Sequence, residues 1–243
     1  WNALNDIYDF EIDLVNRPER PLPSGRISLN HAKTATAITM ISSIFSIALC
    51  YWVISELNPV EGFEVSDWYP SLAIWIMALI LLINYEFPFG LRLKDKGLPG
   101  NISISISVGL VVVFGASAVF EPFSEKAWSL FFVGIFYNTS REIIKDVQDM
   151  EGDKGRNTLA MRIGSENART VAWVMSILAL ASVLLPFAIG IFPPLHVVLV
   201  IPAVMTLMMV KGRIIIGEDA SASSLLKKSM LLCLAALLTS SLI

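Results

Sequence analysis

The sequence predicts an all-α protein, built as a bundle of helices that cross a membrane. Hydrophobic residues make up 55% of the chain and charged residues only 16%, against about 25% charged in a typical soluble domain. The mean hydropathy is +0.66. Several apolar stretches are long enough to cross the roughly 30 Å of bilayer hydrocarbon. The net charge of −3 offers no overall attraction for phosphate backbones, which argues against a nucleic-acid partner.

Seven full spans and a short N-terminal helix at 1–12 are expected, with prolines breaking the chain between several of them. Cys50 and Cys233 both lie in apolar stretches, so we expect inert core thiols. The chain starts inside an apparent helix and lacks an initiator Met. We therefore expect 1–243 to be a single, N-terminally truncated transmembrane domain. The predicted spans are 31–57, 68–86, 101–120, 124–145, 166–191, 194–211 and 222–243.

The charges between these spans predict the orientation of the chain. If alternate connections share one side, 17 of the 18 Lys and Arg residues fall on that side, and only Lys126 falls on the other. Cytoplasmic loops carry an excess of Lys and Arg, so the basic side is predicted to be cytoplasmic. The opposite side carries mainly acidic residues, namely Glu56, Glu61, Glu64, Asp67, Glu121 and Glu125.

An acidic face occurs at the cytoplasmic end of the N-terminal helix. At 100° per residue, five side chains fall within an arc of about 100°. Like charges packed so closely repel unless a cation neutralises them, and hard oxygen ligands in this pattern suit Mg²⁺. A solvated surface face is the alternative, which the membrane character of the chain disfavours. The five residues are Asn2, Asn5, Asp6, Asp9 and Asp13.

A second acidic cluster is predicted on the same side, at the end of the span that begins near 124. Gly152 is a candidate end of this helix before Asp153. Two acidic helix ends on one membrane face can share a polyanion such as a diphosphate through Mg²⁺. Metals and cations that stabilise the developing negative charge allow an allylic diphosphate to leave, giving a carbocation. The cluster comprises Asn138, Glu142, Lys145, Asp146, Asp149 and Asp153.

These motifs carry a resemblance to a known family. The stretch Asn5-Asp-Ile-Tyr-Asp-Phe-Glu-Ile-Asp13 resembles the Asn-Asp-x-x-Asp-x-x-x-Asp motif of the UbiA superfamily of intramembrane prenyltransferases. Asp149-x-x-x-Asp153, preceded by Asp146, is similar to its second Asp-rich motif, and 16–26 is also typical. The resemblance covers essentially the whole chain and implies a nine-helix transmembrane bundle, with the first helix and part of the second missing here. It implies that Mg²⁺ is held by Asn5 and by six catalytic aspartates: Asp6, Asp9, Asp13, Asp146, Asp149 and Asp153.

Within the superfamily, Arg141-Glu-Ile-Ile-Lys-Asp146 with Glu151-Gly-Asp153 most resembles the archaeal ether-lipid branch. That resemblance implies transfer of a geranylgeranyl group from geranylgeranyl diphosphate to the sn-2 hydroxyl of geranylgeranylglyceryl phosphate. The implied partners are a prenyl diphosphate, a phosphoglycerol ether-lipid acceptor and membrane lipids, with no obligate protein partner. Two alternatives remain open. One is UbiA-type transfer to an aromatic acceptor of quinone, haem or chlorophyll-type pathways, and a remote one is a membrane transporter or cation channel.

Substrate binding is expected from amides and cations near the acidic clusters. Most of the cations on this side are explained by topology alone, but proximity to the clusters favours some of them as phosphate ligands. The resemblance also places a tyrosine in the loop before Asn101, a position held by either Tyr85 or Phe89. The predicted substrate-binding residues are Asn2, Asn5, Arg17, Arg20, Arg26, Arg92, Lys94, Asn101, Asn138, Arg141, Lys145 and Arg156.

Overall fold

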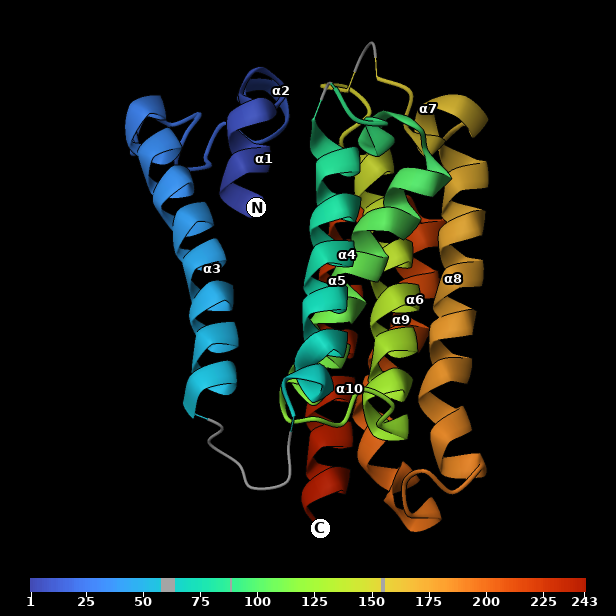
Figure 1. Cartoon of the computed structure of the whole chain (residues 1–243). Helices are drawn as coiled ribbons and strands as arrows, with labels where there is room; N and C mark the ends of the chain where they lie inside the picture. Colours follow the sequence, from blue (N-terminus) through green and yellow to red (C-terminus); the bar gives the residue numbers. More distant parts are fainter. Residues whose placement is uncertain (58–63, 88, 154–155) are drawn as a thin grey trace.

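The computed structural model describes residues 1–57, 64–87, 89–153 and 156–243, and in these ranges it is a helical bundle without β-strands (Figure 1). The predicted all-α class is confirmed. In chain order the elements are α1 (Asn2–Tyr8), α2 (Phe10–Asn16), α3 (Leu29–Leu57), the 3₁₀ helix η1 (Val65–Trp68), α4 (Tyr69–Glu86), η2 (Leu93–Asp95), α5 (Leu98–Ala118), α6 (Glu125–Gln148), α7 (Leu159–Ile163), α8 (Ser165–Ala188), η3 (Pro194–Val200), α9 (Ile201–Ile215) and α10 (Asp219–Leu242).

Six helical segments of the described chain are long and apolar enough to cross a membrane, one fewer than predicted. They correspond to α3, η1–α4, α5, α8, η3–α9 and α10. The seventh predicted span, 124–145, forms the 24-residue helix α6, which is not among the six because its last turns carry charged side chains. This helix packs against α5, α8 and α10, so its polar face is covered by protein instead of lipid.

The main core lies between α6, α8, α9 and α10. Its buried residues include Tyr137 of α6 and Leu207 of α9. Alanines on α8, such as Ala172, are fully buried and let neighbouring helices approach closely, as small residues do in membrane bundles. Cys233 lies in this core as expected, whereas the expectation of a core thiol at Cys50 is wrong. Cys50 belongs to α3, whose most apolar stretch has no residue buried against the described part of the chain.

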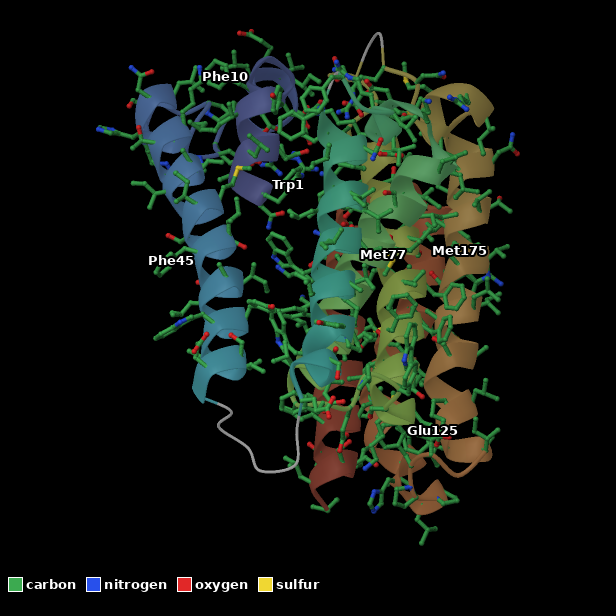
Figure 2. All side chains as sticks on the ribbon, viewed as in Figure 1. Trp1, Phe10, Phe45, Met77, Glu125 and Met175 are labelled. Atoms are coloured by element: carbon green, nitrogen blue, oxygen red, sulfur yellow. The ribbon has the colours of Figure 1, made fainter. Side chains whose placement is uncertain are left out.

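The first three helices stand beside the main bundle (Figure 1). Helix α3 contacts α1 and η1, and its exposed Phe45 points away from the other helices (Figure 2). The predicted helix at 1–12 is two short helices that meet at Asp9 (φ −93°, ψ 13°). Backbone hydrogen bonds nevertheless continue through the junction, from Asp9 N–H to the carbonyl of Asn5 and from Asp13 N–H to that of Asp9, both 2.8 Å.

The acidic motifs lie at one end of the molecule. Helices α2 and α7 and the C-terminal end of α6 gather at the top of Figure 1, whereas the connections at 119–124 and 189–193 lie at the bottom. Phe10 and Glu125 mark the two ends in Figure 2. This arrangement agrees with the predicted grouping of the loops. Two charged residues used to predict the orientation, Glu61 and Lys154, lie outside the described residues.

Candidate functional site

A polar cavity of about 90 Å³ lies where the ends of α2, α4 and α6 meet the start of α5. Carboxylates, amides and cations form most of its wall. It brings together residues of both acidic motifs, which are more than 130 positions apart in the sequence. Its lining comprises Asn5, Asp9, Ile12, Asp13, Asn16, Arg17, Arg20, Tyr85, Lys94, Gly100, Asn101, Glu142, Lys145, Asp146, Asp149, Asp153 and Arg156.

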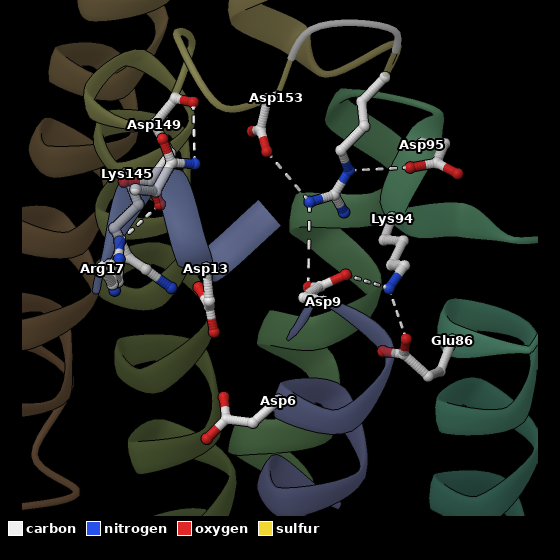
Figure 3. A network of polar contacts seen from close by, with 12 residues as sticks. Asp6, Asp9, Asp13, Arg17, Glu86, Lys94, Asp95, Lys145, Asp149 and Asp153 are labelled. Atoms are coloured by element: carbon white, nitrogen blue, oxygen red, sulfur yellow. Dashed lines mark hydrogen bonds and ion pairs between the residues drawn. The ribbon is translucent and has the colours of Figure 1, made fainter. Parts of the chain in front are cut away.

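The first motif supplies two buried carboxylates, Asp9 and Asp13 (Figure 3). A cation from another segment meets the charge of each. Asp9 Oδ1 accepts a hydrogen bond from Lys94 Nζ at 2.7 Å. Asp13 Oδ2 accepts one from Arg20 Nη1 at 2.6 Å, and the same nitrogen lies 2.9 Å from Asp6 Oδ1. Arg20 therefore holds together two carboxylates that would otherwise repel each other.

The second motif lies opposite, on the turn that follows α6. Arg17 Nη2 donates to Asp149 Oδ2 at 2.5 Å. Arg156 Nη1 donates to Asp153 Oδ1 at 3.2 Å, and that nitrogen is also 3.9 Å from Asp9 Oδ2. Arg156 thus bridges the two motifs across the cavity.

Burial raises the pKa of the Asp149 and Asp153 carboxyl groups above the usual range for aspartate. Arg17 opposes this shift at Asp149, and Arg156 opposes it at Asp153. The pKa of Asp6 is also raised, first by burial. These carboxylates are therefore costly to keep ionised unless positive charge lies close by, and the arginines provide that charge in the structure.

An ion pair at the end of α4 supports the wall of the cavity. Lys94 Nζ contacts Glu86 as well as Asp9, and the side chains of Lys94 and Glu86 are almost fully buried. The second Glu86 carboxylate oxygen, Oε2, is buried and has no hydrogen-bond partner among the described residues. Glu86 is not among the site residues predicted from the sequence. Its signal was an ionisable residue at the end of an otherwise apolar span, which is costly in a membrane and commonly functional.

The family of UbiA prenyltransferases matches this chain over residues 1–232. The chain belongs to the UbiA prenyltransferase family. It is accordingly a multi-pass membrane protein and a prenyltransferase, which places the two acidic motifs and their cavity in an enzyme and leaves the transporter or channel alternative without support.

Two relatives of the chain within the UbiA family carry the same name. The chain is 35% identical to the digeranylgeranylglyceryl phosphate synthase of Methanosarcina mazei over 82% of this chain and 62% of that protein. It is 33% identical to the enzyme of the same name from Methanopyrus kandleri, over 98% of this chain and 81% of that one. A solved structure, "Structural and mechanistic insights into the biosynthesis of Digeranylgeranylglyceryl phosphate synthase in membranes", matches with a TM-score of 0.64 and 28% identity, over 98% of this chain and 79% of that chain.

Most of the residues predicted from the UbiA motifs line the cavity, but several lie elsewhere. Asp6 lies outside the lining, although Arg20 links it to Asp13. Helix α6 ends at Gln148, so Asp149 and Asp153 belong to its C-terminal cap and the following turn. The residues brought to the cavity are Asn5, Asp9, Asp13, Arg17, Arg20, Lys94, Asn101, Lys145, Asp146, Asp149, Asp153 and Arg156.

Five predicted substrate-binding residues do not line the cavity. Arg26 is exposed and bonds to the loop itself, and Arg92 pairs with a neighbouring aspartate. Arg141 pairs with the next residue of α6. Asn138 is buried and donates to a serine hydroxyl of α5, which is a packing contact within the bundle. Asn2 is exposed on α1.

The structure separates the two candidates for the tyrosine position of UbiA enzymes. Tyr85, on the last turn of α4, lines the cavity. Phe89 is 79% exposed and stacks on Phe87 at a ring-centroid distance of 4.9 Å. Of the two candidates, Tyr85 is the one that lines the cavity.

The residues that could hold a divalent cation are divided between the two motifs. Within the described ranges, no group of three or more His, Cys, Asp or Glu side chains is arranged to hold a metal ion by itself. However, Asn101 donates through Nδ2 to Asp146 at 3.0 Å, and its buried Oδ1 has no partner in the described part of the chain. This amide oxygen and the carboxylates are hard ligands of the kind that Mg²⁺ prefers.

Proposed function

We propose that this prenyltransferase transfers a geranylgeranyl group from geranylgeranyl diphosphate to the sn-2 hydroxyl of geranylgeranylglyceryl phosphate, releasing diphosphate. The observation that carries the proposal is the meeting of two acidic segments around one polar cavity. The names of the relatives, one of them 33% identical over 98% of this chain, support the acceptor. The family match over 1–232 supports treating 1–243 as one prenyltransferase domain.

Magnesium is proposed as the cofactor, held by both motifs together with the substrate. Mg²⁺ in proteins commonly takes one or two carboxylates and completes its coordination with water and substrate phosphates. Carboxylates on both walls fit this requirement, with Asp9 and Asp13 on one wall and Asp149 and Asp153 on the other. The Asn101 Oδ1 atom, which has no partner among the described residues, adds a further oxygen. When bound, the cation would neutralise negative charge that develops on the leaving diphosphate.

Cations of the chain would bind the diphosphate oxygens directly. Arg17, Arg20 and Arg156 each contact a carboxylate of an acidic motif, and a bound diphosphate would compete for their donors. Guanidinium groups match phosphate geometry and make strong charge-assisted hydrogen bonds. As the bond between C1 of the prenyl chain and its diphosphate oxygen breaks, the electron pair leaves with the diphosphate. The acceptor oxygen then bonds to C1, and its proton passes to the departing diphosphate or to water.

An apolar groove of about 560 Å³ is proposed to hold the prenyl chain. It runs between α3 and α4 and is lined by side chains such as Met40, Trp75 and Phe87. Phe87 contacts the rings of Trp1 and Tyr8 at centroid distances of 5.8 and 5.7 Å. Because Tyr8 precedes Asp9, the groove begins beside the polar cavity, which is where an amphiphilic diphosphate needs its apolar neighbour.

The active site is proposed to face the cytoplasm. Arg17, Lys94 and Arg156 belong to connections that the positive-inside rule assigns to that side. A cysteine-accessibility experiment tests the orientation, with Glu11→Cys at the motif end and Leu195→Cys at the other end, both exposed positions. In right-side-out vesicles, a membrane-impermeant thiol reagent is expected to label only Leu195→Cys. Labelling of Glu11→Cys alone would show that the orientation is the opposite of the proposed one.

A direct transfer assay tests the proposed reaction. Purified protein receives labelled geranylgeranyl diphosphate with Mg²⁺ and either geranylgeranylglyceryl phosphate or 4-hydroxybenzoate. We expect a labelled ether lipid with the first acceptor and no product with the second. Turnover with the aromatic acceptor alone would favour the alternative UbiA activity and overturn the proposed acceptor.

A further inference from the structure

Asn16, the last residue of α2, contacts the backbone of the second acidic motif with both ends of its side-chain amide. Its Nδ2 donates to the carbonyl of Asp149 at 3.1 Å. Its Oδ1 accepts from the backbone N–H of Gly152 at 3.0 Å. Asn16 therefore holds the turn of the second motif against the helix that carries the first.

Gly152 permits this contact because it has no side chain. A Cβ atom added at Gly152 would overlap the Asn16 amide, since its three nearest atoms are Oδ1, Cγ and Nδ2 of that side chain. The backbone of Gly152 is not in the left-handed region, so an alanine there meets no backbone strain. The obstacle to a side chain at Gly152 is therefore Asn16 itself.

The turn that Asn16 holds carries the carboxylates of the second motif. The N–H of Asp153 bonds to the carbonyl of Asp149 at 3.0 Å, and that carbonyl is also the acceptor for Asn16. A displacement of the turn at this carbonyl would move Asp149 and Asp153 together and change their distances from Asp9 and Asp13. Groups that orient ligands without touching the bound ion typically change affinity or activity by about 10–100-fold when removed.

We infer that Asn16 is a positioning residue that sets the separation of the two acidic motifs by clamping the backbone at Asp149 and Gly152. The inference rests on the proposed function, because the role concerns binding of Mg²⁺ and diphosphate between the motifs. It differs from a role as a ligand, since both polar atoms of the amide are directed to the backbone of this chain.

A double-mutant cycle between Asn16→Ala and Gly152→Ala tests the clamp. Each single variant is expected to lower kcat/KM by about 10–100-fold and to raise the Mg²⁺ concentration needed for half-maximal transfer. In the Asn16→Ala background the space at Gly152 is free, so adding Gly152→Ala is expected to change kcat/KM less than about 2-fold, a non-additivity typical of residues in contact.

Two control variants and a binding readout separate positioning from general damage. Asn167→Ala removes an exposed amide that bonds to a helix-end carbonyl, and Gly115→Ala adds a methyl group where no atom lies within 4 Å. Both are expected to retain activity. Thermal stabilisation by Mg²⁺ with inorganic diphosphate is expected to shrink in both clamp variants, while the unfolding temperature without ligands changes little.

Additive effects of the two substitutions, or a harmless Gly152→Ala in the otherwise native chain, would overturn the inference. Should Asn16→Ala fail to fold, Asn16→Ser replaces it in the same cycle. A native chain that transfers no geranylgeranyl group to geranylgeranylglyceryl phosphate, or transfers it equally well without Mg²⁺, would instead refute the proposed function, so the two failures are distinguishable.

Discussion

Arg17 Nη2 lies 2.5 Å from Asp149 Oδ2, which joins two residues 132 positions apart in the sequence. The contact runs from the segment after the first acidic motif to the second motif. Arg20 and Arg156 make comparable contacts with Asp13 and Asp153. Cations of the chain thus neutralise both motifs, so that several carboxylates can share one small cavity before any ligand binds.

Removing one of these carboxylates should prevent transfer without unfolding the protein. Asp149→Asn keeps the size of the side chain but loses the charge, and we expect transfer to fall roughly 100-fold or more, as when a group that stabilises developing charge is removed. Transfer of the labelled prenyl group measures the loss. Glu11→Gln is the matched control, because Glu11 is exposed on the same short helix as Asp13. Unchanged activity in Asp149→Asn would remove Asp149 from the proposed site.

The buried Lys94 and Glu86 pair should be sensitive to the loss of one partner. Lys94→Met leaves the buried Glu86 carboxyl group without its cation, and breaking such a pair costs about 3–5 kcal/mol. The double variant Glu86→Leu with Lys94→Met should recover much of this unfolding free energy but not the activity, because Asp9 still lacks Lys94. Thermal unfolding and prenyl transfer, measured on the same samples, check both parts. Full recovery of transfer in the double variant would show that Lys94 has only a structural role.

Two glycines of α5 should respond differently to alanine. At Gly100 a Cβ would overlap the carbonyl oxygen of Leu93 and approach Lys94 Cα to 3.2 Å, whereas at Gly115 nothing lies within 4 Å. Gly100→Ala should push η2 away from α5 and displace Lys94, which lowers transfer. Gly115→Ala should be tolerated, since alanine is the better helix former by about 1 kcal/mol. Equal activity in the two variants would show that the position of η2 does not matter for the reaction.

Much of the fold and site was predictable because membrane helices and acidic motifs leave strong local signals. The spans follow from apolar length, and the motif spacing selected Asp9, Asp13, Asp149 and Asp153. Glu86 escaped prediction because its importance depends on Lys94, which the fold brings to it. Two further features were not predicted for a related reason. The break between α1 and α2 at Asp9 depends on tertiary contacts, and the exposure of Cys50 depends on contact with lipid.

The ligand dependence of stability should show that both Mg²⁺ and diphosphate are needed. Because the carboxylates are already paired with cations, Mg²⁺ alone has to displace those cations and should stabilise the protein weakly. With diphosphate present, the arginines gain phosphate partners. Both ligands together, at 100 times their dissociation constant, should add about 2.7 kcal/mol. A thermal-shift series with each ligand alone and with both measures this. If Mg²⁺ alone gave the same thermal shift as both ligands together, the arginines would not exchange their carboxylate partners for diphosphate as expected.

The two distant acidic motifs are proposed to bind one metal–diphosphate group between them. An anomalous diffraction map with Mn²⁺ in place of Mg²⁺, from crystals containing a thiodiphosphate analogue of the prenyl donor, tests it most directly. We expect manganese peaks beside the carboxylates of both motifs, Asp9 or Asp13 on one side and Asp149 or Asp153 on the other, with the diphosphate between them. Manganese and diphosphate bound at one motif only, or in separate cavities, would contradict the claim.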